Sequence, residues 1–149
     1  MATELNSFLE KHNLPSLNDL ESELGRLHID DEDIILFLIK KLSDKVNVYI
    51  DFLSDRLQPD SDLISMQEAN MFDGNERKEM FYLLKNIIYQ DRVFMKINLN
   101  GTEGDKINYF KEYFNNWSVL KLKLVPFVQK AINVWKLKDD DVKFEAYFG

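Results

Sequence analysis

The sequence contains no cysteine, two histidines, five glycines and three prolines. Without a thiol, disulfides, zinc–thiolate sites, iron–sulfur clusters and cysteine nucleophiles are excluded. Because glycine and proline mark most turns, their scarcity indicates helices joined by short connections. The longest uncharged stretch, Tyr113 to Leu120, has eight residues, whereas a membrane-spanning helix needs roughly 20. The first residues show no basic region followed by an apolar one, so we expect no signal peptide and a cytoplasmic protein.

Motifs for catalysis and cofactor binding are also missing. The residues three positions before His12 and His28 are Leu9 and Gly25, so the Glu-x-x-His ligands of di-iron bundles are absent. The sequence contains no phosphate-binding glycine loop, no His-Glu-x-x-His motif, no calcium loop and no Gly-x-Ser-x-Gly elbow. We therefore expect neither a metal nor a cofactor, and we favour a non-catalytic protein over an enzyme.

The 149 residues, of which 45% are hydrophobic and 30% charged, are typical of a single globular domain. The net charge of −7 is unevenly distributed: residues 1–75 carry 6 basic and 16 acidic residues (−10), and residues 76–149 carry 13 and 10 (+3). Between Lys106 and Lys138, seven lysines accompany one acid, Glu112. An overall negative charge argues against a protein whose main task is binding phosphate backbones. Acidic and basic helices packed side by side explain the asymmetry.

Apolar residues recur at intervals of three and four along most of the chain. This period predicts an all-α fold, namely an antiparallel bundle of four to six helices, three of them long. We expect the long helices at Asp30–Gln58, Asn75–Lys96 and Asp105–Lys138, and shorter ones at Thr3–His12, after Ser16 and at Ser61–Phe72.

Side chains that can cap helix starts support these boundaries. We expect Ser16 to cap the second helix, Asp30 the first long one, Asp73 with Glu76 the next, and Asp105 the last.

Three features leave alternatives open. Pro126 predicts a kink or a break of the last helix near Val125. Residues 93–105 alternate as a hairpin would, with Asn100-Gly101 as its turn, but the polar stretch 102–106 favours a helix ended by Gly101. Residues 139–149 form either an extended segment laid on the bundle or a flexible tail.

Asp91 is the one residue that interrupts an apolar helix face, since it follows Leu84 and Ile87 and precedes Phe94 at helical spacing. It is a candidate buried acid, either paired with a lysine of the last helix or facing a pocket. The candidate pocket lining is Tyr49, Met80 and Ile87. A candidate basic and aromatic surface comprises Lys106, Lys111, Tyr113, Lys121 and Lys123, although core packing of the aromatics is favoured.

Three functional hypotheses follow. The first is an interaction or scaffold protein that self-associates as a dimer, because the Asp30–Gln58 helix carries an apolar stripe too wide for one core. The second is a small-molecule-binding or enzymatic bundle with a pocket near Asp91. The third is a nucleic-acid accessory protein that uses the Lys106–Lys138 region.

Overall fold

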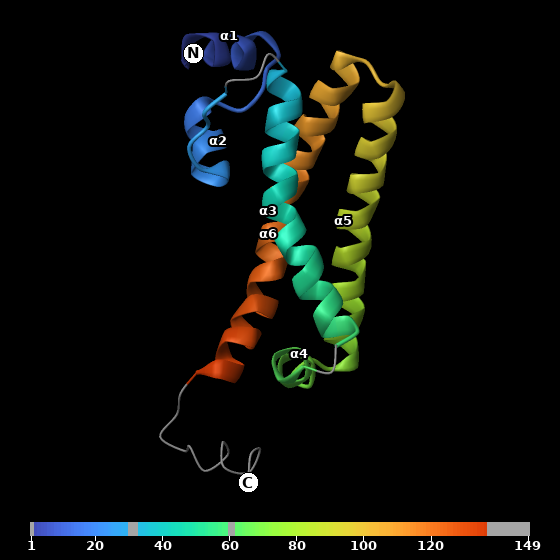
Figure 1. The fold of residues 1–149 in the computed structure, drawn as a ribbon. Helices are drawn as coiled ribbons and strands as arrows, with labels where there is room; N and C mark the ends of the chain where they lie inside the picture. The colour runs from blue at the N-terminus through green and yellow to red at the C-terminus, as the bar shows by residue number, and fades with distance from the viewer. Residues whose placement is uncertain (1, 30–32, 60–61, 137–149) are drawn as a thin grey trace.

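The computed structural model describes residues 2–29, 33–59 and 62–136. Within them the chain forms six helices and no strand, so the all-α prediction is confirmed. Figure 1 shows α3 and α5 running side by side in opposite directions, with α6 crossing behind α3. The helices α1 and α2 pack at the beginning of α3, and α4 lies at its end (Figure 1). The helices are α1 (Ala2–Lys11), α2 (Leu17–Leu24), α3 (Ile34–Leu57), α4 (Leu63–Ala69), α5 (Gly74–Asn100) and α6 (Glu103–Trp135).

Two of the expected caps are present. The Ser16 side chain accepts a hydrogen bond from the Asp19 backbone N–H at the start of α2. At the start of α5, the Asp73 side chain accepts from the Glu76 backbone, and the Glu76 side chain accepts from the Asp73 backbone. These reciprocal bonds satisfy backbone donors that the first helical turn leaves unpaired.

Two other caps differ from the prediction. The N-cap of α3 is Asp33, whose carboxylate accepts from the Leu36 backbone N–H, and Asp30 lies outside the described residues. The N-cap of α6 is Thr102, while Asp105 is the third helical residue and closes a capping box with it. In both cases the expected cap lies three residues from the observed one, because aspartate and threonine can each cap a helix and the sequence pattern alone does not decide which residue does so.

The hairpin alternative for residues 93–105 is wrong, because α5 continues to Asn100. Gly101 ends it, and its N–H donates to the Ile97 carbonyl at 2.7 Å. A Cβ at Gly101 would lie 2.6 Å from that carbonyl oxygen, so only glycine fits this close approach. The polar stretch after it forms the capping box of α6 instead of a strand.

Pro126 does not break the last helix, since α6 is continuous from Glu103 to Trp135. Proline cannot donate to the carbonyl four residues earlier, that of Leu122. Leu122 and Pro126 both lie on the exposed side of α6, where water can satisfy that carbonyl. The predicted extended or flexible segment at 139–149 lies outside the described residues.

The wide apolar stripe of α3 is buried within a single copy of the chain. Six of its apolar side chains are fully buried, and six more hydrophobic side chains pack partly buried against the same core. Val48 is the one large apolar side chain of α3 that is exposed. The stripe therefore does not require a second copy, and the sequence-based reason for a dimer through this helix is removed. Within the described residues, no helix combines the length and the apolar character needed to cross a bilayer.

Candidate functional site

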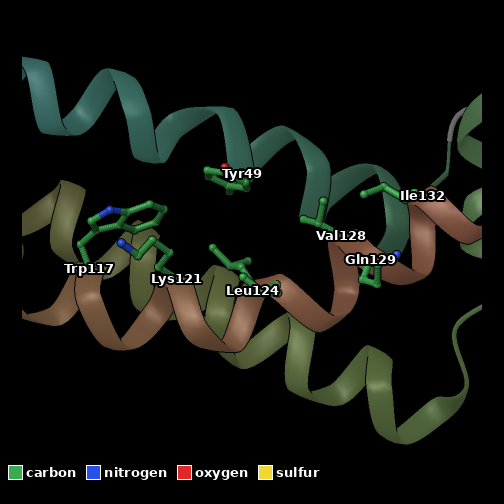
Figure 2. A pocket seen from close by; sticks show the side chains of 8 residues that line it. Tyr49, Trp117, Lys121, Leu124, Val128, Gln129 and Ile132 are labelled. Atoms are coloured by element: carbon green, nitrogen blue, oxygen red, sulfur yellow. The ribbon is translucent and has the colours of Figure 1, made fainter. Parts of the chain in front are cut away.

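An apolar groove runs between α3 and the second half of α6, and we call it the α3–α6 groove. Its volume is about 170 Å³. Figure 2 shows Tyr49 projecting from α3 toward α6, whose side chains form the other wall. The Tyr49 and Trp117 rings lie 5.6 Å apart, centroid to centroid, and close one end. The lining residues are Tyr49, Trp117, Lys121, Leu124, Val125, Val128, Gln129 and Ile132.

Three exposed apolar side chains of α6 border this groove or flank it, namely Leu122, Val125 and Ile132, which we call the α6 rim. Their exposed fractions are 73%, 56% and 54%. Val125 and Ile132 also line the groove. The intervals of three and seven residues place all three on one side of the helix. A helix that keeps such side chains in water beside an apolar groove has the character of an interaction surface.

A first polar cluster, the Glu23 clamp, fixes α2 to α3 and α6 at one end of the groove. Glu23 accepts a hydrogen bond from the Trp117 indole N–H at 2.5 Å and one from the Lys121 ammonium at 2.9 Å. The Lys45 ammonium of α3 lies 3.3 Å from the same carboxylate. Burial acts to raise the pKa of Glu23, but these hydrogen bonds and the charge of Lys45 outweigh it and hold the pKa below its ordinary value.

A second cluster, the Glu68 clamp, fixes α4 to α3 and α6 at the far end. Glu68 accepts from the Trp135 indole N–H at 2.9 Å and from the guanidinium of Arg56. Arg56 and Glu68 are both buried, and Arg56 lies over the Phe52 ring at 4.7 Å. Within the described part of the chain, Nε and Nη1 of Arg56 find no hydrogen-bond acceptor. The Asp55 carboxylate, 4.0 Å from Nη1, supplies charge attraction only.

The two clamps explain how the groove is positioned. Each joins one short helix to both walls of the groove, because each contains a cation of α3 and a tryptophan of α6. Trp117 and Lys121 belong to the Glu23 clamp and also line the groove. Trp135 lies three residues beyond Ile132, the last lining residue. The spacing between α3 and α6 is thus set at both ends by hydrogen-bonded pairs.

Asp91 is half-exposed rather than buried, with 36% of its side chain in contact with solvent. It pairs with Arg92 at 2.6 Å, its neighbour on the same helix, rather than with a lysine of α6. Two α6 tyrosines occupy the interior beside it. Burial raises the pKa of Tyr113 to about 12 and the charge of Asp91 adds to this, while burial also raises the pKa of Tyr109. The Tyr109 hydroxyl donates to the Gln90 carbonyl at 2.8 Å.

The structure does not bring the predicted pocket residues together. Tyr49 lines the α3–α6 groove, whereas Met80 and Ile87 are almost completely buried in the core. The α6 rim was not among the predicted site residues, because the apolar periodicity of the last helix marks its core face only. The α6 rim residues, Leu122, Val125 and Ile132, lie outside that face. Apolar residues outside a predicted core face are the sequence signal that could have indicated this surface.

The predicted basic and aromatic surface is also divided. Tyr113 is buried and cannot stack on a base. Lys121 is bound to Glu23. Lys106 and Lys111 are partly buried, and Lys123 is exposed. Among the described residues, no three acidic or histidine side chains gather closely enough to hold a metal ion.

No protein-family model matches the chain, and no curated protein or solved structure matches it either.

Proposed function

We propose that this protein is a non-catalytic interaction or scaffold protein that self-associates, and that two copies meet through the α6 rim and the α3–α6 groove. One observation carries the proposal: Leu122, Val125 and Ile132 remain more than half exposed beside an apolar groove. The interface is thus assigned to α6, in place of the α3 stripe that the sequence suggested.

The surface suits a two-fold contact because it carries both projecting side chains and a depression. In a two-fold interface the same patch is used twice, so the rim of each copy can enter the groove of the other. Lys121, the cation of the groove, is paired with Glu23, which limits charge repulsion between the copies.

The expected affinity is modest, because the interface adds only a few half-exposed aliphatic side chains from each copy to the buried surface and lost translational freedom must be offset. We therefore expect a dissociation constant between about 1 μM and about 1 mM.

Sedimentation equilibrium of the full chain tests this proposal. The parent protein should show a monomer–dimer equilibrium, and the double variant Val125→Asp/Ile132→Asp should be a monomer because it would bury two charges. Val48→Asp is the matched control, since Val48 is an exposed apolar residue on α3, and it should dimerise like the parent. A parent that stays monomeric up to about 1 mM contradicts the proposal.

The same groove also favours a second candidate function, the binding of a small apolar molecule. Its volume of about 170 Å³ is close to that of an engineered cavity that binds benzene, about 150 Å³. In a titration with indole, the parent protein should bind the ligand and the Tyr49→Ala variant should bind it more weakly. Equal binding by both proteins would exclude the groove as the binding site.

A further inference from the structure

The outward side of α5 is a second exposed surface, separate from the α6 rim. It consists of three rows in which a residue recurs every seven positions, and all nine side chains are exposed. We call this set the α5 outer face. The apolar row is Phe81, Ile88 and Met95, the cationic row is Lys78, Lys85 and Arg92, and the third row contains two tyrosines and a lysine, Tyr82, Tyr89 and Lys96.

The seven-residue period determines which type of secondary structure can pack along these rows. A row repeating every seven residues drifts only about 20° around the helix per repeat. The apolar row from Phe81 to Met95 therefore forms a nearly straight line about 21 Å long. A second helix lying along α5 would contact this row over its full length, as in a coiled coil. Tyr82 and Tyr89, 56% and 65% exposed, lie about 100° around the helix from this row, beyond the cationic row, and offer further large rigid contacts.

The charges on this face decide which helix fits. Lys78, Lys85 and Lys96 form no ion pair with any other described residue, and Arg92 pairs with Asp91. Two α5 outer faces placed together would bring these cations close to one another, which disfavours a second copy as the occupant.

We infer that the α5 outer face is a docking site for an amphipathic helix of a partner protein, with apolar residues in a seven-residue repeat and carboxylates on one side of them. The apolar residues of that helix pack on Phe81, Ile88 and Met95. Its carboxylates pair with Lys78 and Lys85, in the manner of the charged positions that select partners in coiled coils.

The test uses two labelled synthetic peptides of about 21 residues, or three heptads, that share one apolar row. One carries glutamate beside the apolar row and the other carries lysine. Fluorescence anisotropy with the full chain should show that the glutamate peptide binds about tenfold more tightly or better. Ile88→Ser should weaken binding of the glutamate peptide by a similar factor.

Charge-reversal variants distinguish specific docking from nonspecific association. Lys85→Glu should weaken binding of the glutamate peptide and strengthen binding of the lysine peptide. Lys123→Glu, an exposed lysine of α6, is the matched control and should change neither. Equal binding of the two peptides, no binding of either, or equal effects of the two reversals would overturn the inference. A dimer abolished by Ile88→Ser but retained by Val125→Asp/Ile132→Asp would assign the face to a second copy and overturn it as well.

Discussion

The two clamps have the same design but different surroundings. In each, a glutamate of a short helix accepts an indole N–H from α6 and faces a cation of α3. The Glu23 clamp is partly wet, since its two lysines are 35% and 44% exposed. The Glu68 clamp is dry, with Arg56 and Glu68 exposed by 7% and 10%.

The difference in solvent exposure determines how much each clamp contributes to stability. A partly exposed ion pair gains little, because water and salt screen it and long side chains must be ordered. A buried pair does not have to stabilise the fold relative to apolar residues, yet it cannot be broken cheaply, because the remaining charge is left without a partner. Removing one partner of the Glu68 clamp should therefore cause a large loss of stability, whereas removing one partner of the Glu23 clamp should cause a small one.

Glu68→Ala should cause the greatest loss of stability. It leaves the buried Arg56 guanidinium without its carboxylate and removes the acceptor of Trp135, so the free energy of unfolding should fall by about 3 to 5 kcal/mol. Urea denaturation measures this change. Glu79→Ala, at an exposed position of the neighbouring α5, is the control and should stay within about 0.5 kcal/mol of the parent. A loss from Glu68→Ala no larger than that of the control would show that the buried pair is not structurally important.

An intermediate effect is expected from the two tryptophans. Trp117→Phe keeps a ring in the core but removes a partly buried hydrogen bond to a charged carboxylate, which should lower the free energy of unfolding by about 2 kcal/mol. Trp135 is 46% exposed, so Trp135→Phe should lower it by about 1 kcal/mol. The same urea experiment ranks the two variants. The reverse order would mean that the hydrogen bond to Glu68 matters more than burial of the indole.

The smallest effect concerns Glu23, and it depends on pH. Because the folded-state pKa of Glu23 is lowered below its ordinary value of 4.5, its contribution to stability is present above that pH and is lost as the pH falls below it. Glu23→Gln should therefore lower the free energy of unfolding by about 0.5 kcal/mol near neutral pH. The gap to the parent should close as the pH is lowered toward 3. A gap that is the same at pH 7 and pH 3 would show that the ionised form of Glu23 is not what holds α2.

The helices could be predicted because their signals are local. The three-four spacing in Ile35, Leu38 and Leu42 specifies a buried face without reference to the rest of the chain. The capping pair of Asp73 and Glu76 is likewise contained within four residues. Two helix starts moved because several residues can perform the same capping task, as at Asp33 and Thr102, whereas α5 runs on to Asn100, beyond the expected end at Lys96.

The candidate site could not be predicted in the same way, because its parts are distant in sequence. Glu23 and Trp117 are 94 positions apart and meet only after α2 has packed beside α6. Asp91 interrupted the apolar face, but its helix position fell at an edge where Arg92 could pair with it. Whether an apolar face remains exposed depends on which helices cover it, and the pattern of one helix does not contain that information.

Hydroxyl-radical footprinting of the parent protein at low and high concentration can detect self-association through α6, because it reports the solvent exposure of individual side chains. Oxidation of Leu122, Val125 and Ile132 should fall as the concentration rises from about 1 μM to about 1 mM. Oxidation of Val48, which is exposed on α3, should stay constant. Unchanged oxidation of the α6 rim over that range, or equal loss at Val48, would contradict self-association through α6.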